Sequence, residues 1–383
     1  MAGMRYDVIV VGAGPAGAMA ARDCAGAGLE TVILEKEYHP RPKTCAGGVS
    51  AAAVNLLGAA LPPEIVEARC SSFRGIYGSR VVEIDLEQDF MVLVSREIFD
   101  RWLISLAQSA GAELKQGERV TAVAAGEREV TVSTTKGVYT GLMVIGADGI
   151  NSTVARIVRK PFQKKDLAFC VCADVARGEA EGGWREAIEI HYGLLPMGYS
   201  WIFPKRGHLS MGMGSWLANA SGLKEAFSNF LQDKGIMEEQ RSKGGFIPLG
   251  GIARPTVSDR VILAGDAAGY TDPFTGEGIR YAVASGRLAA ATAASLIARG
   301  APLTKLHLGV YERNCYQQFG SDLKAALFIA RMFRYFPKAL FNMYFSCREP
   351  FEQSLQILLG QTGYRQFYRW LLWHTPGMLR RCI

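Results

Sequence analysis

The sequence predicts an α/β fold, in which helices flank a parallel sheet, and three observations support this prediction. An apolar segment at residues 6–11 leads into a glycine-rich turn and a helix, and a second apolar segment at residues 31–34 ends at Glu35. Two further apolar segments, at residues 143–146 and 261–264, end in Ala-Asp-Gly and Gly-Asp, and each precedes a helix. Strands that alternate with helices in this way lie parallel in one sheet.

The glycine-rich turn has the pattern of a dinucleotide site, Gly12-Ala13-Gly14-Pro15-Ala16-Gly17. Gly12 permits the tight turn, and Gly14 lets a pyrophosphate approach the backbone at the helix N-terminus. Gly17 lets the helix pack closely against the strand. Glu35 lies 18 residues after Gly17 and is expected to accept hydrogen bonds from the ribose hydroxyls of the adenosine. This unit therefore predicts a Rossmann-like dinucleotide-binding domain.

Two later motifs resemble the second and third fingerprints of the glutathione-reductase-type FAD folds, in their aromatic-hydroxylase branch. They are Ala147-Asp148-Gly149, and Gly265-Asp266 with the following Pro273-Phe274-Thr275-Gly276-Glu277-Gly278-Ile279. The resemblance implies that Asp266 binds the ribityl chain and that Asp148 lies near the pyrophosphate. It also implies that backbone amides near Gly276 and Gly278 face the pyrimidine edge of the flavin, where they would stabilise an anionic reduced ring.

Arg96 opens a helix expected over residues 96–110, and it matches an arginine that this branch places against FAD. No second glycine fingerprint is present, so electrons are expected from a transiently docked donor, either NAD(P)H or a ferredoxin-like protein. The residues assigned to FAD are Gly12, Gly14, Ala16, Gly17, Glu35, Lys36, Cys45, Ala46, Gly47, Arg96, Val120, Asp148, Gly149, Asp266, Gly276, Gly278 and Ile279.

An aromatic strand is expected within residues 196–204, which have a proline at each end. Tyr199, Trp201 and Phe203 alternate along it, so they share one face, and Ser200 and Ile202 share the other. Aromatic strand faces are ordinarily part of the core. The neighbouring motifs favour a substrate wall instead.

Three segments resemble the geranylgeranyl reductase family across roughly residues 5–300. They are the Pro-x-x-Tyr-x-Trp-x-Phe-Pro pattern at 196–204, the Cys45-Ala46-Gly47-Gly48 loop and the Ile247-Pro248-Leu249-Gly250-Gly251 segment. Ala46 stands where many relatives carry glycine. The resemblance implies an FAD-dependent oxidoreductase that saturates isolated C=C bonds of geranylgeranyl chains. The lipid precursor of the digeranylgeranylglycerophospholipid reductases is the first expectation, with chlorophyll and quinone side chains as alternatives.

The expected mechanism is hydride delivery from N5 of the reduced flavin to the substituted alkene carbon, with protonation of its neighbour. Tyr199, Trp201 and Phe203 would bind the apolar chain, and their faces would stabilise the developing positive charge. Cys45 is the expected proton donor by resemblance, and Tyr199 or a water molecule are alternatives. Two rival functions are an FAD monooxygenase or halogenase of the same fold and a flavin-dependent sensor without catalysis.

The expected FAD domain is discontinuous and covers residues 1–70, 96–160 and 255–300. An inserted substrate domain covers residues 71–95 and 161–254. Short alternating segments at residues 187–192, 199–203 and 208–212 predict strands of a mostly antiparallel sheet there. Residues 301–383 are expected to be helical, to cover the substrate slot and to face a membrane. From residue 325 onwards the chain holds a net charge of +6, out of +7 in total, together with 13 aromatic residues. This composition suits an anionic membrane surface.

The remaining expectations concern cellular setting and the 8 cysteines. No Cys/His set has metal-ligand spacing, so no metal is expected, and the thiols are expected to be reduced. Cys170 and Cys172 are expected to point to opposite faces of a strand. With no evident transmembrane helix or nucleic-acid module, we expect a cytoplasmic monomer that is peripheral to the cytoplasmic membrane.

Overall fold

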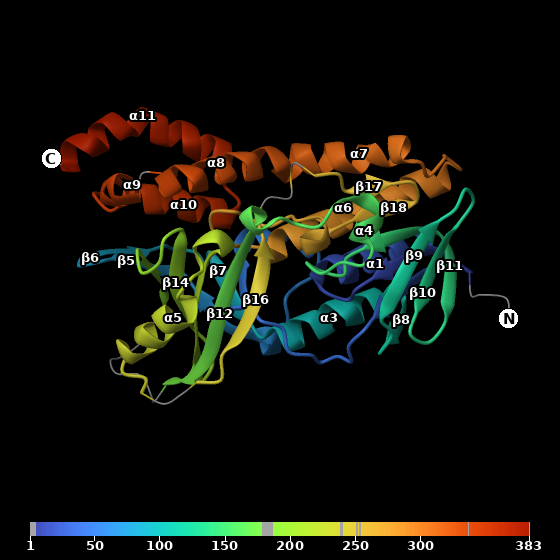
Figure 1. Cartoon of the computed structure of the whole chain (residues 1–383), viewed down its shortest axis with the longest axis horizontal. Coiled ribbons are helices and arrows are strands. Elements are labelled where there is room, and N and C mark those ends of the chain that lie inside the picture. Colours follow the sequence, from blue (N-terminus) through green and yellow to red (C-terminus); the bar gives the residue numbers. More distant parts are fainter. Residues whose placement is uncertain are drawn as a thin grey trace.

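A computed structural model describes residues 5–177, 187–237, 240–249, 252, 254–335 and 337–382, with only the backbone described at residues 376 and 379–382. Figure 1 shows two main sheets at opposite ends of an elongated molecule, with the C-terminal helices along one long side. A small third sheet is formed by strands that fall, along the chain, between strands of these two sheets. The predicted α/β fold class, with a second antiparallel sheet and a helical C-terminal region, is confirmed.

The first sheet has the strand order β17-β18-β11-β1-β2-β8, and β10 and β9 extend it beside β11. β1 pairs parallel with β2 and β11, and β11 pairs parallel with β18. The carboxyl ends of these strands therefore meet at one edge, where ligands of such sheets bind. The strands span Arg5–Val11 (β1), Thr31–Glu35 (β2), Glu113–Gln116 (β8), Val120–Ala125 (β9), Val130–Thr134 (β10), Val138–Gly146 (β11), Val257–Ser258 (β17) and Val261–Leu263 (β18).

Helices α1 and α6 pack tightly beside this sheet. A Cβ atom on Gly286 of α6 would lie 2.2 Å from the carbonyl oxygen of Ala16 in α1, so the two backbones touch. By length and hydropathy α6 could cross a membrane, but 56% of its apolar window is buried inside the protein, as in a core helix. The first six helices are Pro15–Gly26 (α1), Ala51–Leu56 (α2), Arg96–Ser109 (α3), Ala155–Val158 (α4), Leu223–Gln232 (α5) and Ile279–Ala298 (α6).

The second sheet has the order β16-β12-β15-β14-β13-β5-β6 and is antiparallel except between β13 and β5. The third sheet has the order β3-β7-β4. The strands span Gly48–Ser50 (β3), Val66–Cys70 (β4), Ser72–Tyr77 (β5), Arg80–Asp85 (β6), Met91–Val94 (β7), Leu167–Ala176 (β12), Ala187–Tyr192 (β13), Gly198–Pro204 (β14), His208–Trp216 (β15) and Lys243–Pro248 (β16).

The C-terminal helices are joined to the second sheet by aromatic contacts. The ring of Phe341 stacks on that of Tyr77 at 5.0 Å, and the ring of Phe351 lies 5.7 Å from that of Phe73. Phe73 and Phe351 belong to one apolar core that the C-terminal helices share with the second sheet, and Tyr77 and Phe341 pack against that core. The predicted domain limits stay predictions. The helices are Lys305–Cys315 (α7), Ser321–Tyr335 (α8), Pro337–Tyr344 (α9), Glu349–Leu359 (α10) and Tyr364–Cys382 (α11).

Candidate active site

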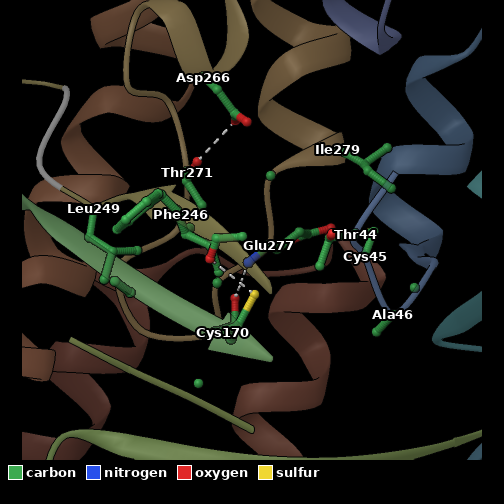
Figure 2. Close-up of a pocket in the computed structure, with 18 of the residues that line it drawn as sticks. Thr44, Cys45, Ala46, Cys170, Phe246, Leu249, Asp266, Thr271, Glu277 and Ile279 are labelled. Carbon is green, nitrogen blue, oxygen red and sulfur yellow. Dashed lines mark hydrogen bonds between the residues drawn. The ribbon is translucent and has the colours of Figure 1, made fainter. Parts of the chain in front are cut away.

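One connected cavity of about 1350 Å³ reaches from the carboxyl edge of the first sheet to the second sheet and helices α8–α11. Figure 2 shows part of its lining. All three residues of the predicted aromatic wall line the cavity. So do most residues assigned to FAD, namely Gly12, Gly14, Ala16, Glu35, Lys36, Cys45, Ala46, Arg96, Val120, Asp148, Gly149, Asp266, Gly276, Gly278 and Ile279.

The glycine-rich turn between β1 and α1 is built for close backbone approach. Gly12 has φ +96°, and a Cβ atom there would lie 2.5 Å from the carbonyl oxygen of Ala147. A Cβ on Gly17 would lie 1.9 Å from the carbonyl oxygen of Gly12, so Gly17 serves packing and does not line the cavity. A Cβ on Gly14 would meet only the guanidinium of Arg41, at 3.9 Å. The turn is thus open on its cavity side, as a pyrophosphate requires.

Glu35 ends β2 next to this turn and is only 4% exposed. Its Oε2 atom accepts a hydrogen bond from the backbone N–H of Ala13 at 2.7 Å, and its Oε1 accepts one from Glu37 at 3.0 Å. The carboxylate therefore fixes the turn and also faces the cavity. Each oxygen has a second lone pair, so it can still accept a ribose hydroxyl.

Arg96 begins α3 in a buried ion pair. Its guanidinium donates to both carboxylate oxygens of Asp100, at 2.8 and 2.9 Å, and Arg41 contacts the same carboxylate at 3.5 Å. Burial disfavours the charge of Arg96, but Asp100 and the adjacent thiol group of Cys45 outweigh this and raise the pKa of Arg96. A fixed cation therefore stands beside Cys45 at the cavity wall.

Asp148 follows β11 and accepts hydrogen bonds through Oδ2 from the backbone N–H groups of Thr153 and Val154. Burial raises the pKa of Asp148. Its buried Oδ1 has no partner among the described residues. Asp148 thus organises the turn after its strand and leaves one acceptor atom at the cavity.

Asp266 and the loop before α6 form another part of the cavity wall. The hydroxyl of Thr271 donates to Asp266 at 3.4 Å, as Figure 2 shows. A Cβ on Gly278 would lie 3.6 Å from the same carboxylate. The loop and the N-terminus of α6 therefore place backbone amides and an acid on one side of the cavity.

Three side-chain contacts hold this loop from other elements. The hydroxyl of Tyr199 on β14 donates to the carbonyl oxygen of Thr275. The hydroxyl of Tyr364 on α11 donates to Asp272 at 2.6 Å. Ser50 at the end of β3 donates to Glu277. The second sheet, the C-terminal helices and the third sheet thus all position the loop.

The aromatic strand β14 presents its side chains as its alternation predicts. Trp201 and Phe203 belong to one apolar cluster with Tyr199 packed against it, whereas Ile202 belongs to another. A Cβ on Gly48 would lie 3.0 Å from the ring of Phe203, and one on Gly212 would lie 2.1 Å from the ring of Trp201. The wall therefore contacts two loops. Tyr199 contacts the loop before α6, and Phe203 contacts the Cys45 loop.

The apolar part of the cavity continues under the C-terminal helices. Sequence reasoning assigned these helices to cover the substrate but named none of their residues. The lining there is almost wholly aromatic or aliphatic, and Lys338 is the one charged side chain that the described parts of α8–α11 add to it. The lining residues in these helices are Ala330, Phe333, Pro337, Lys338, Phe341, Tyr344, Phe351, Ser354, Leu355, Leu358 and Tyr364.

The Cys45 loop lies at the junction of these two parts. The backbone N–H of Gly47 donates to the sulfur of Cys45 at 3.3 Å, and Gly47 itself does not line the cavity. The expectation that Cys170 and Cys172 point to opposite faces was wrong. Both line the cavity, because residues two apart on a strand share a face. Gly250 and Gly251 of the third family segment lie outside the described residues.

Glu277 is a polar cavity residue that sequence reasoning also missed, although its motif was quoted. Burial raises the pKa of Glu277 to about 7. The missed signal was an acid between the two glycines assigned to the flavin, a position with little water to solvate a charge. Taken together, the open glycine turn, the cavity-facing carboxylate of Glu35 and the amides at the start of α6 fit FAD.

Comparison with known proteins agrees with this geometry. Residues 5–176 match the family described as FAD binding domain. A solved geranylgeranyl bacteriochlorophyll reductase-like protein from Thermoplasma acidophilum superposes with a TM-score of 0.83 at 22% identity, over 98% of each chain. A flavin-dependent brominase superposes with a TM-score of 0.72 at 19% identity, over 98% of this chain and 100% of that one. These two structures show the fold alone.

Curated relatives are closer in sequence. Geranylgeranyl diphosphate reductase of Rhodobacter capsulatus is 34% identical over 78% of each chain. Digeranylgeranylglycerophospholipid reductase 2 of Methanothermobacter thermautotrophicus is 31% identical over 85% of this chain and 86% of its own. The fold, the FAD-type site and these relatives lead to one assignment: the chain belongs to the geranylgeranyl reductase family of FAD-dependent oxidoreductases.

Proposed function

We propose that this protein saturates isolated C=C bonds in the geranylgeranyl chain of an isoprenoid lipid precursor. The observation that carries the proposal is the continuity of one cavity, which joins the FAD-type residues to an apolar slot lined by β14 and α8–α11. A prenyl chain has no charge and few polar groups, so apolar burial supplies its binding energy, at about 0.8 kcal/mol for each CH₂ group. The slot offers that burial.

In this proposal the residues that hold FAD occupy the first-sheet end of the cavity. Gly14 and the N-terminus of α1 face the pyrophosphate, Glu35 takes the ribose and Asp266 takes the ribityl chain. Bound FAD supplies a hydride once it has been reduced. The amides near Gly276 and Gly278 favour negative charge on the reduced ring, because they stand at the N-terminus of α6.

Tyr199, Trp201 and Phe203 are proposed to hold the alkene against the flavin. Trp201 and Phe203 are 7% and 9% exposed and give the chain a rigid apolar surface. The aromatic faces also attract the positive charge that develops on the substituted carbon. Cys45 is proposed to line the reacting region, beside the cation of Arg96.

The preferred substrate is a glycerophospholipid precursor, and chlorophyll or quinone side chains remain alternative prenyl carriers. Electrons come from NAD(P)H or from a ferredoxin-like protein that docks transiently. We propose further that the protein acts as a monomer in the cytoplasm at the surface of the cytoplasmic membrane. Exposed Tyr335 and Trp373 on the C-terminal helices, at 71% and 84%, support this last point.

Anaerobic incubation with chemically reduced flavin tests the proposal. A geranylgeranyl lipid should gain two hydrogen atoms for each double bond reduced, as measured by mass spectrometry, and the flavin should be reoxidised in step. An intact lipid after complete flavin reduction would refute the function. Rapid flavin reoxidation by dioxygen with oxygen transfer to a substrate would favour the monooxygenase or halogenase alternative.

A further inference from the structure

Glu277 stands where three parts of the cavity meet. Its neighbours Gly276 and Gly278 line the part assigned to the flavin, and Glu277 itself lines the same cavity. On one side a Cβ at Gly276 would lie 3.1 Å from the hydroxyl oxygen of Tyr199 in the aromatic wall. On the other side Glu277 accepts a hydrogen bond from Ser50, which lies two residues after Gly48, the glycine next to the ring of Phe203. Figure 2 shows Glu277 among the lining residues, with Thr44, Cys45 and Ala46 of the Cys45 loop.

The carboxyl group of Glu277 is oriented but incompletely bonded. Its Oε1 accepts from the hydroxyl of Ser50, which also accepts from the backbone N–H of Ala53 at 3.1 Å. Its Oε2 is buried and has no partner in the part of the chain that the structure describes. A buried carboxyl oxygen without a donor favours the protonated acid, whose O–H then needs an acceptor.

We propose that Glu277 is the catalytic acid that protonates the alkene carbon next to the one that receives hydride. This inference rests on the proposed function and deepens it, because it identifies the group that completes the reduction. The proposal is carried by the position of this carboxyl group. It belongs to the loop before α6 that is assigned to the flavin, it lines the cavity near the aromatic wall, and its Oε2 has no hydrogen-bond partner among the described residues.

The atoms and electrons of the step balance. The π electrons of the C=C bond form a new C–H bond with the carboxyl proton of Glu277. The adjacent carbon, with tertiary cation character, accepts the hydride and its electron pair from reduced FAD. The alkene is thereby reduced, the flavin is oxidised by two electrons, and Glu277 is left as a carboxylate. A proton from solvent restores the acid before the next turnover.

In this proposal Glu277 takes the role that the resemblance gave to Cys45. The sulfur of Cys45 accepts the backbone N–H of Gly47 and lies beside the Arg96 guanidinium. Three other nearby acids are also less suited to this role. The hydroxyl proton of Tyr199 is committed to the carbonyl oxygen of Thr275, and burial raises the pKa of this tyrosine above its ordinary value. Asp272 is 1% exposed and already accepts from Phe274, Thr275 and Tyr364. Cys170 is held against the carbonyl oxygen of Gly245, and burial raises the pKa of its thiol to about 12.

The pH dependence follows from all the charges around Glu277. Burial is the largest effect and Asp272 acts in the same direction, whereas Arg280 and the hydrogen bond from Ser50 oppose it. Tyr281 on α6 and Tyr364 on α11 are the further titratable groups that face it. Because the acid must be protonated to act, the rate should fall as pH rises through about 7.

The test compares wild type with Glu277→Gln, which keeps the shape and the acceptor for Ser50 but holds no acidic proton. Chemically reduced holoenzyme is mixed anaerobically with a geranylgeranyl lipid, and flavin reoxidation is followed. We expect a rate lower by a factor of about 100 or more and no alkaline fall near neutral pH. Reoxidation by dioxygen and the affinity for FAD should stay unchanged. Glu225→Gln, an exposed acid on α5, should behave as wild type.

A second readout does not use the loaded enzyme. Infrared titration of flavin-free protein should show a protonated carboxyl group that ionises near neutral pH in wild type and is missing in Glu277→Gln. If Glu277→Gln does not fold, Ser50→Ala keeps the test: loss of its hydrogen bond raises the pKa, so the alkaline fall moves to higher pH. An unchanged rate and pH profile in Glu277→Gln would overturn the inference alone. A wild type that reduces no prenyl lipid would instead overturn the proposed function.

Discussion

Glu35 shows how one side chain can serve the fold and the site together. Its carboxylate oxygens accept backbone N–H groups of Ala13 and Glu37 while the group faces the cavity. In Glu35→Gln one of these donors meets an amide NH₂ group, and the negative charge is lost. We expect FAD affinity to fall roughly 10- to 100-fold, the equivalent of about 1.5–3 kcal/mol for hydrogen bonds to a charged group. Flavin fluorescence titration measures this, with exposed Glu30→Gln as the matched control. Equal affinities in the two variants would contradict the role of Glu35.

Trp201 is the residue whose substitution distinguishes a substrate-binding wall from an ordinary core strand. Trp201→Ala should weaken prenyl-lipid binding roughly 10- to 100-fold, because it removes a large apolar surface from the slot. Phe230→Ala removes a comparably buried ring from the apolar cluster on the other face of the sheet and is the matched control. Both variants should retain the flavin spectrum, and only Trp201→Ala should lose lipid affinity. Equal lipid affinity in the two would return Trp201 to an ordinary core role.

Residues of the site differ in how well they can be predicted from the sequence. Gly12, Gly14 and Glu35 follow from local rules, because a turn and its helix are set within a few tens of residues. Strand alternation also placed Tyr199 and Trp201 correctly on one face. The place of Glu277 between two flavin-assigned glycines is visible in the sequence, but the extent of its burial, which raises its pKa, depends on distant elements.

At the scale of elements, Tyr364 joins α11 to the loop before α6, where its hydroxyl bonds to Asp272 and its ring packs against Phe274. Tyr364 donates to Asp272, whose carboxyl group is buried and whose pKa burial raises. The hydrogen bond favours the charged form and so opposes that rise. Tyr364→Phe therefore removes most support at alkaline pH, where Asp272 is ionised, and least at acidic pH, where it is protonated.

We expect Tyr364→Phe to lower the free energy of unfolding by about 1–3 kcal/mol at alkaline pH, with a smaller loss in acid. Urea unfolding of wild type and variant at both ends of the pH range measures the difference. Tyr368→Phe, one turn along the same helix, removes a hydroxyl that does not contact Asp272 and should cost less at every pH. A loss for Tyr364→Phe that is larger in acid would contradict the assigned contact.

The helices and strands also differ in how accurately the sequence predicts their limits and their placement. Strand β13 matches its predicted limits, and β14 and β15 are longer than the alternation indicated. The placement of α8–α10 over the second sheet was foreseen only as a cover for the slot. Contacts such as Phe351 with Phe73 join residues far apart in the chain, and no local pattern encodes which faces meet.

At the scale of the whole molecule, the C-terminal helices that line the slot also carry exposed aromatic and basic residues. Tyr335 and Trp373 are exposed, and Lys338 lines the cavity between them in sequence. We expect the double variant Tyr335→Ser with Trp373→Ser to bind anionic vesicles at least 10-fold more weakly, because two interfacial anchors are lost. Val138→Ser, at an exposed apolar site on β11, is the control. Equal vesicle binding would contradict membrane docking through these helices.

The most direct test of the whole account is the mass of a geranylgeranyl lipid after a single anaerobic turnover with chemically reduced holoenzyme. The account predicts a gain of two hydrogen atoms at one C=C bond, with matching loss of reduced flavin, and a much slower gain in Glu277→Gln. A lipid of unchanged mass beside a fully reduced, bound flavin would contradict the claim that this cavity brings a prenyl chain to FAD.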